Sequence, residues 1–319
     1  MPLISVVMTS YNYGEYISKA IDSVLAQTFS DLELIIVDDA SEDNSRDIIR
    51  SYMNKYARIK AIFHQENLGI SRTVNDGWNA ASGKYIASIS SDDIWASDKL
   101  EKQLEILQGD EDLVVWTEGE IIDAQGRSTG ELFSIVHGAG ERKKGGDIFE
   151  ELLMGNFIFA SSRIFKKDCL RGLQYSENLK YLGDYKFAVD MAREHKYYFM
   201  DEPLTKYRMH GNNTVNRDIE GFYVDTVKLV EYFLSTYGDE VSNDIRMHLH
   251  LFSVNTLKNQ LFQANSQRSQ AEKEIQEMKR SVIWRALMAF QDRVVEKALP
   301  RGKERRRAYD RFIEGCRRL

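Results

Sequence analysis

Short apolar runs alternate with amphipathic segments along the first 120 residues. Five runs are apolar almost throughout, and they predict buried strands at residues 3–9, 32–38, 59–65, 85–90 and 113–119. Apolar residues between these runs recur at helical spacing, which predicts helices at residues 16–27, 45–56, 70–81 and 97–107. Strands without a polar face that alternate with helices indicate a parallel sheet covered on both faces. We therefore expect a doubly wound, Rossmann-like α/β fold.

The second half of the sequence is less regular and ends in a long helical region. Residues 128–144 are irregular and contain glycines, which is typical of a mobile loop. The pattern then predicts a helix at 148–154, a strand at 157–165, a helix at 181–195, and two short strands with a polar loop at 197–214. From Ile219 to about Ala298 it is almost wholly helical. We expect two parts: an α/β domain at residues 1–215 and a helical C-terminal region at residues 216–319.

Composition adds an expected compartment. The 319 residues are 43% hydrophobic and 29% charged, which is ordinary for a globular protein. Cys169 and Cys316 lie far apart and form no metal-binding or disulfide spacing, which indicates a reducing compartment. The first residues lack a basic segment followed by a long apolar run, and no window is apolar enough to span a bilayer. A cytoplasmic location is expected.

Positive charge is concentrated at the C-terminal end. The net charge is −6, although residues 280–319 alone carry 12 Lys/Arg and 5 Asp/Glu, a local +7. Residues 281–307 combine a basic amphipathic helix with a basic run, which suits peripheral contact with an anionic inner-membrane surface. The alternatives are packing on the catalytic domain, or a homodimer formed through the long helices from Asp244 onward. No aromatic interleaving or recognised module supports nucleic-acid binding.

Polar residues gather where the predicted strands end. The first strand ends in TSYN (Thr9–Asn12), the second in Asp38-Asp39 and the fourth in Ser91-Asp92-Asp93. Ligands of parallel sheets bind beyond the carboxyl ends of the strands. There is no glycine-rich phosphate loop, so a carboxylate-rich edge could accept a diphosphate only through an intervening cation such as Mn²⁺ or Mg²⁺.

Three longer stretches resemble the family 2 glycosyltransferases of the GT-A fold. They are TSYNYGEYISKAIDSVLAQTFSDLELIIVDDASEDNS, NLGISRTVNDGWNAASGKYIASISSDD and LGDYKFAVDMA, and the likeness covers roughly residues 2–213 in order. The resemblance implies a metal-dependent, inverting enzyme of the hexosyltransferase type that takes a sugar from a nucleotide-diphosphate donor. It also implies a hydroxyl of a glycan or lipid-linked acceptor, in bacterial surface polysaccharide synthesis.

The resemblance places five residues around the nucleotide or donor sugar. Thr9 and Tyr11 would line the nucleotide pocket, with Tyr11 stacking near the base. Asp39 would accept a hydrogen bond from the base. We favour a UDP-sugar, because uracil offers an imino hydrogen, although guanine and thymine offer one too. Arg72 and Asn75 would lie near the nucleotide or the donor sugar.

The remaining implied roles concern the diphosphate and the reaction. Asp92 would contact the ribose or neighbouring hydroxyls, and Asp93 would bind the divalent metal. The stretch RMHGNNT would close over the diphosphate, with Arg208 stabilising its charge and His210 as a further metal ligand. Asp184, which opens a helix after a glycine, would be the general base.

Plainer interpretations of the same residues stay open. Asp38 and Asp39 could cap the helix that follows them. Asp92 and Asp93 could form a solvated turn, and Asp184 could be a favourable charge in the first turn of a helix. Two other classes of function also stay open: a nucleotidyltransferase, and a non-catalytic nucleotide-binding or scaffold protein.

Overall fold

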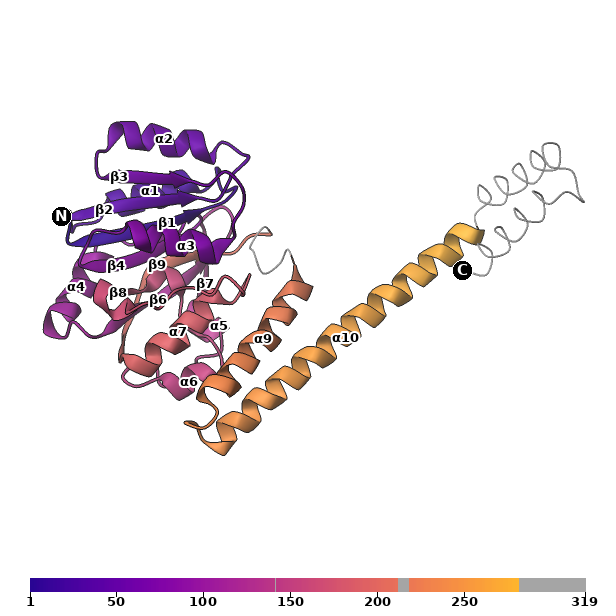
Figure 1. Cartoon of the computed structure of the whole chain (residues 1–319). Helices are drawn as coiled ribbons and strands as arrows, with labels where there is room; N and C mark the ends of the chain where they lie inside the picture. The colour runs from indigo at the N-terminus through magenta and orange to yellow at the C-terminus, as the bar shows by residue number, and fades with distance from the viewer. Residues whose placement is uncertain (141, 212–217, 281–319) are drawn as a thin grey trace, which may run out of the picture. The chain divides into compact units, whose positions relative to one another are not determined.

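The structure is a computed structural model that describes residues 1–140, 142–211 and 218–280. Its centre is a mixed sheet in the order β3-β2-β1-β4-β8-β6-β9-β5, with β7 paired to β6 (Figure 1). The strands in chain order are β1 (Ile4–Ser10), β2 (Leu32–Asp38), β3 (Ile59–Phe63), β4 (Tyr85–Ser90), β5 (Ile94–Trp95), β6 (Val114–Ile122), β7 (Ser128–Leu132), β8 (Ile164–Lys166) and β9 (Tyr197–Arg208).

The first four long strands form the parallel half that the sequence predicts. β1 lies between β2 and β4, and β3 continues the sheet beyond β2, with all three pairings parallel. Every residue of β2 is buried, as expected for a strand covered on both faces. The carboxyl ends of β2, β1 and β4 therefore lie next to one another along one edge of the sheet.

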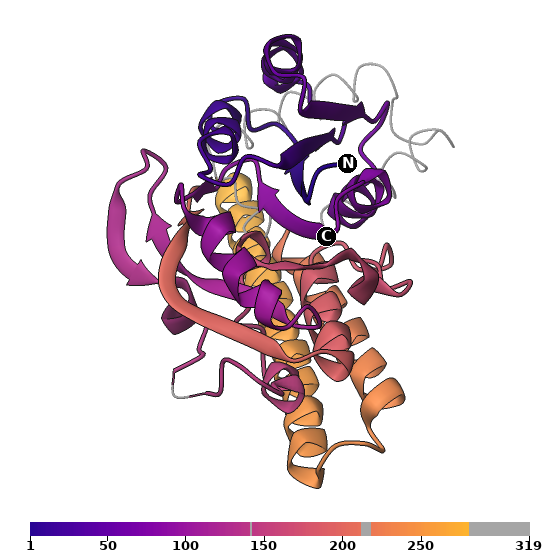
Figure 2. The ribbon, with the colours of Figure 1, turned by 90° about the vertical axis from the view of Figure 1, so that its left-hand side faces the viewer.

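Helices cover both faces of the sheet, which the view of Figure 2 shows from a second side. The helices are, in chain order, α1 (Ile17–Leu25), α2 (Ser45–Lys55), α3 (Ile70–Ala80), α4 (Lys99–Gly109), α5 (Phe133–Val136), α6 (Phe149–Leu153), α7 (Gly183–Glu194), α9 (Ile219–Tyr237) and α10 (Asn243–Arg280). Neighbouring residues of β1 point to opposite faces: Val6 packs into a core with α1 and α4, whereas Val7 packs into a core with α3, α7 and α9. The α/β fold with a helical C-terminal extension is confirmed.

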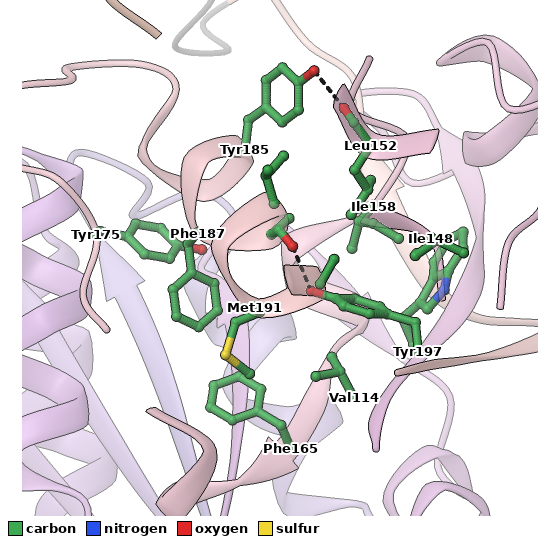
Figure 3. Packing of buried hydrophobic residues seen from close by; sticks show 14 of the residues in the cluster. Val114, Ile148, Leu152, Ile158, Phe165, Tyr175, Tyr185, Phe187, Met191 and Tyr197 are labelled. Atoms are coloured by element: carbon green, nitrogen blue, oxygen red, sulfur yellow. Dashed lines mark hydrogen bonds between the residues drawn. The ribbon is translucent and has the colours of Figure 1, made fainter. Parts of the chain in front are cut away.

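The second of these cores joins α7 to the sheet. Phe187 and Met191 of α7 lie beside Phe165 of β8, and Tyr175 packs against Phe187 (Figure 3). The hydroxyl of Tyr185 donates a hydrogen bond of 2.7 Å to the carbonyl of Leu152. This bond joins the first turn of α7 to α6 and so holds the start of α7 in place.

Three local predictions in the second half were wrong. Residues 128–144, expected as an irregular loop, contain β7 and α5; every residue of β7 is exposed, so no apolar alternation marks this strand. The strand expected at 157–165 is irregular at residues 157–159, forms a 3₁₀ turn at Ala160–Ser162 and is extended only in the short β8. The two strands expected from Tyr197 are a single strand, β9, whose register against β6 shifts near Pro203.

The C-terminal helices contribute to two units of the chain, Met1–Leu257 and Lys258–Leu319. Helix α9 and the first turns of α10 belong to the first unit, where Leu229, Phe233 and Leu249 are buried in the core with α7. The division at residues 215 and 216 stays a prediction. No helix in the described ranges is long and apolar enough to cross a membrane, and residues 281–307, where we predicted membrane contact, lie outside those ranges.

Candidate active site

A cavity of about 960 Å³ opens at the edge where the parallel strands end. Six of the ten residues singled out in the sequence line it: Thr9, Tyr11, Asp39, Asp92, Asp93 and Asp184. The turns after β1 and β2 bend sharply, since Asn12 and Ala40 both adopt positive φ angles, 56° and 60°. Such backbone is costly for an alanine, and strained backbone is found preferentially at functional sites.

Asp93 is held at the floor of the cavity by neutral donors. The Ser161 hydroxyl donates to its Oδ2 at 2.7 Å, and the backbone N–H of Arg208 donates to its Oδ1 at 3.1 Å. Burial and the neighbouring charge of Asp92 raise the pKa of Asp93 well above its usual range. The 3₁₀ turn at residues 160–162 and the end of β9 thus fix the carboxylate, and neither donor brings a full charge to neutralise it.

His210 meets Asp92 rather than Asp93. Its Nε2 lies 3.2 Å from Asp92 Oδ2, and the imidazole stacks on the ring of Tyr16. The described residues contain no group of three or more His, Cys, Asp or Glu side chains placed to hold a metal ion. The two adjacent carboxylates, Asp92 and Asp93, are oxygen ligands of the kind that Mg²⁺ and Mn²⁺ prefer, so they fit a dication that takes its other ligands from phosphate oxygens and water.

Arg208 lies beneath the site and does not line the cavity. Its guanidinium donates hydrogen bonds to the backbone carbonyls of Asp92, Asp123 and Ala124 at 2.8 to 3.1 Å and stacks over the Tyr16 ring. The side chain is completely buried. These bonds tie the acidic turn after β4 to the hairpin turn after β6. Our expectation placed this cation against the diphosphate, whereas these three hydrogen bonds join it to the protein backbone.

The two residues predicted on α3 also lie outside the cavity lining. Arg72 is half exposed and pairs with Asp76 and Glu177. Asn75 is buried and makes two hydrogen bonds of 2.9 Å with the backbone of Tyr175, one through its Nδ2 and one through its Oδ1. Asn75 therefore fastens the loop before α7 to α3.

Asp39 organises the loop that leads into α3. Its carboxylate accepts hydrogen bonds of 2.8 Å from the backbone N–H groups of Leu68 and Gly69, and another contact of 2.8 Å joins it to His64. These bonds hold the turn before α3, and none of them reaches the first turn of α2, the helix that follows Asp39 in sequence. The neighbouring Asp38 has a completely buried side chain, and its Oδ1 lies 2.7 Å from Arg46 Nε.

Asp184 lies in the first turn of α7 and lines the cavity. Burial raises the pKa of Asp184, while the charge of Arg163 and the backbone N–H of Tyr185 oppose that rise. Arg163 is almost fully buried and donates to the Tyr175 hydroxyl at 2.7 Å, and among the described residues its Nε and Nη1 have no hydrogen-bond partner. Gly183 lets α7 begin here, because a Cβ at this position would lie 2.6 Å from Ser71 Oγ.

Sequence reasoning missed a group of aromatic residues on the same cavity. Phe133, His137, Phe159 and Tyr207 all line it, and their rings contact one another at 3.8 to 6.3 Å between centroids. The Nδ1 of His137 bonds to the Phe133 carbonyl at 3.0 Å, and since a carbonyl only accepts, this nitrogen carries the proton. Burial lowers the pKa of His137, so the neutral ring leaves Nε2 as an acceptor. The spacing of Phe133 and His137, one helical turn apart, was the available signal.

Comparison with known proteins agrees with this fold. The sequence model of the family described as "Glycosyl transferase family 2" matches residues 5–152. An uncharacterized glycosyltransferase of Rickettsia typhi is 33% identical over 222 residues, which are 67% of this chain and 66% of the relative. The chain thus spans just under two thirds of that relative's length. A putative teichuronic acid biosynthesis glycosyltransferase of Bacillus subtilis, TuaG, is 44% identical over 106 residues, 33% of this chain and 42% of its own.

Solved structures resemble the chain at lower identity. TarS of S. aureus, crystallised with UDP-GlcNAc, is 18% identical with a TM-score of 0.58, covering 82% of this chain and 72% of the other. The mannosyltransferase PcManGT of Pyrobaculum calidifontis, in complex with GDP-Man and Mn²⁺, is 15% identical with a TM-score of 0.56, covering 93% and 86%. These likenesses define a glycosyltransferase fold of the GT-A class. An uncharacterized glycosyltransferase of Methanocaldococcus jannaschii is 32% identical over 236 residues, 73% of this chain and 78% of its own length. The chain belongs to glycosyl transferase family 2.

Proposed function

We propose that this chain is a metal-dependent, inverting glycosyltransferase that moves a sugar from a nucleotide-diphosphate donor to an acceptor hydroxyl. One observation carries the proposal. A single cavity collects Thr9, Tyr11 and Asp39 at the strand ends, the paired acids Asp92 and Asp93, and Asp184. Nucleotide recognition, charge neutralisation and proton transfer can thus occur around one bound donor.

The donor is proposed to be a UDP-sugar. Asp39 already accepts from two backbone N–H groups and contacts His64, but a carboxylate has about four acceptor positions, so a base imino hydrogen can still bind at the remaining one. The UDP-GlcNAc bound by TarS supports uracil, whereas the GDP-Man bound by PcManGT keeps guanine as the second candidate. Tyr11 and Thr9 supply the wall against which the nucleoside packs.

Mn²⁺ or Mg²⁺ is the proposed cofactor, held by Asp93 and by the Asp92–His210 pair. When bound, it would neutralise the negative charge of the leaving diphosphate. The chain's own contribution is to position these ligands before the donor arrives. Ser161 and the Arg208 backbone fix the Asp93 carboxylate, and the Arg208 side chain fixes the backbone of Asp92. Preorganised groups of this kind avoid the cost of rearrangement during the reaction.

Asp184 is proposed to accept the proton of the attacking hydroxyl. A base of this kind contributes about 10²–10⁴-fold in rate. A single base that acts on one in-line displacement inverts the anomeric centre. The aromatic rings of Phe133, Phe159 and Tyr207 give the same part of the cavity flat apolar faces, which suit the C–H faces of an acceptor sugar ring.

The biological setting is proposed to be surface polysaccharide synthesis, with a glycan or lipid-linked acceptor. The putative teichuronic acid role of TuaG supports it. A cytoplasmic location, with peripheral contact to the inner membrane through residues 281–307, remains part of the proposal. Nothing in the composition favours nucleic acid as a partner.

A ligand panel tests the donor and the metal together. Thermal shifts with UDP, GDP, dTDP and CDP, each with and without Mn²⁺, should show one nucleotide that stabilises strongly only with metal. At a concentration of about 100 Kd, the stabilisation should be about 2.7 kcal/mol. In Asp93→Ala the metal-dependent part should vanish, and full activity in chelator would exclude the metal role.

The base is tested by Asp184→Asn, with Glu194→Gln at the other end of α7 as a matched control. Asp184→Asn should lose transfer activity and keep nucleotide binding close to wild type, while the control keeps both. Products also separate the reaction classes: a glycosyltransferase releases a nucleoside diphosphate, whereas a nucleotidyltransferase releases pyrophosphate. Equal loss of binding and transfer in Asp184→Asn would mean that this residue is structural.

A further inference from the structure

Helix α10 presents apolar side chains on two different sides. On one side, Ile245 and Leu249 are buried in the core of the first unit, and Thr256 is buried in line with them. The exposed large apolar residues described on this helix include Phe252, Leu261 and Phe262. Four others, all before Lys258, lie on the side away from Leu249, and we call them the α10 stripe: Met247 (60% exposed), Leu251 (53%), Val254 (44%) and Leu257 (48%). A helix that is apolar on opposite sides is ordinarily buried on both.

The α10 stripe has the geometry of a helix–helix seam. At about 100° per residue, its four members span roughly a third of the helix circumference, on the side away from Leu249. Met247 and Val254 are seven residues apart, and the same interval leads on to Leu261, which is 63% exposed. Apolar residues at heptad spacing fit the face of a second helix.

The charge pattern around the stripe also favours a protein partner. From Met247 to Ser266 the only formally charged residue is Lys258, and the polar positions are mainly Asn, Gln, Ser and Thr. Helices that lie on anionic lipid carry many Lys or Arg residues beside their apolar face. An almost uncharged helix face lacks that electrostatic attraction, but it can be placed against an identical face without like-charge repulsion.

We propose that the α10 stripe is the interface of a homodimer in which α10 of one chain packs against α10 of a second copy. A second copy supplies a stripe of the same length, spacing and neutrality, and a two-fold axis places the two identical patches face to face. The contact buries side chains that the single chain leaves in water. The interface lies on residues outside the catalytic cavity, so each copy keeps its own complete site.

Charge insertion into the stripe tests the interface. The full chain should sediment near twice 36.9 kDa at micromolar concentration. Val254→Glu should weaken the dimer by at least about tenfold, as for a residue at the centre of a packed interface. Asn259→Glu, an equal charge change at an exposed position on another side of the helix, should leave the dimer intact. Both variants should keep the nucleotide-dependent shift of the wild type. Only Val254→Glu should lower the melting temperature, because association stabilises the folded chain, and this difference should shrink as the wild type is diluted.

Cysteine cross-linking gives an independent readout that does not depend on loss of association. In a chain that carries Cys316→Ser, with the buried Cys169 retained, Val254→Cys should form covalent dimers under mild oxidation, and Asn259→Cys should not. A wild-type chain that is monomeric across the micromolar range overturns the proposal. So does a dimer that tolerates Val254→Glu, or a Val254→Glu variant whose only defect is lost binding to vesicles of anionic phospholipid.

Discussion

Asn75 offers a direct test of whether the residues on α3 serve the donor or the fold. The family resemblance implies a place near the nucleotide. In the structure, however, the Asn75 side chain forms hydrogen bonds with both the N–H and the carbonyl of Tyr175. Tyr175 in turn packs on Trp78 and Phe187 and holds the guanidinium of Arg163. Asn75→Ala should therefore release the loop that supports the wall of the site.

The size of the effect follows from the two hydrogen bonds. Each leaves a buried backbone group without a partner, at about 1–3 kcal/mol per group. Because Tyr175 lines the cavity, water can reach part of this space, so we take the lower half of the summed range, about 2–4 kcal/mol. For a unit of this size, roughly 2–4 °C per kcal/mol gives a melting temperature lower by about 4–16 °C.

Urea unfolding and UDP titration of the same protein separate the two roles. Asn75→Ala should lose stability as estimated and keep its UDP affinity in the presence of Mn²⁺ within a few-fold of the wild type. Arg72→Ala is the control on the same helix, since its side chain is half exposed and its ion pairs lie at the surface, where pairs contribute little. If Asn75→Ala instead loses UDP affinity more than tenfold at unchanged stability, Asn75 contacts the nucleotide and our reasoning is wrong.

Two further predictions concern packing and pH. A methyl group at Gly77 would lie 2.3 Å from a side-chain carbon of β1, so Gly77→Ala should push α3 from the sheet and reduce the free energy of unfolding by about 1–3 kcal/mol, measured in urea. A carboxyl with a raised pKa gives up its proton only at higher pH, so kcat/KM should fall on acidification at a higher pH than for an ordinary aspartate. Arg163 lowers the pKa of Asp184; Arg163→Met should therefore move this acidic limb to still higher pH, and an unmoved limb would assign it to another group.

The parallel half of the fold could be predicted because its signals are local. The continuous apolar runs of β1, β2 and β4 specify strands covered on both faces, and alternation with helices specifies parallel pairing. Parallel strands end at a common edge, so Asp39 and Asp93 could be placed together from the sequence, and the structure brings both to one cavity. Short or exposed elements carry no such signal, which is why β5 and β7 were missed.

The hydrogen bonds that hold Asp92 and Asp93 in place could not be predicted, because they join residues far apart in the sequence. Ser161 is 68 positions from Asp93, and Arg208 is 116 positions from the Asp92 carbonyl that its side chain holds. A serine in a turn or an arginine at a strand end has many equivalent uses. The stretch RMHGNNT, with its arginine and histidine, led us to expect that Arg208 contacts the diphosphate. In this fold the Arg208 guanidinium instead donates hydrogen bonds to backbone carbonyls.

Asp92 and Asp93 together form what we call the acidic floor of the cavity. Its electrostatic balance explains why an enzyme with this fold would bind a cation. Two adjacent carboxylates that are nearly excluded from water are costly unless positive charge compensates them. The hydrogen bonds to Asp93 come from a hydroxyl and a backbone N–H, and the Asp92 carboxylate meets one imidazole. The charge of the buried Arg208 guanidinium also acts on Asp93, but the pKa of Asp93 is still raised, so these groups compensate only part of the negative charge. A pyrophosphate alone would worsen this balance, whereas a dication that arrives with it would improve it. Donor and metal should therefore bind with positive cooperativity, each raising the affinity for the other by the same factor. Equal UDP affinity with and without Mn²⁺ would refute this interpretation of the acidic floor.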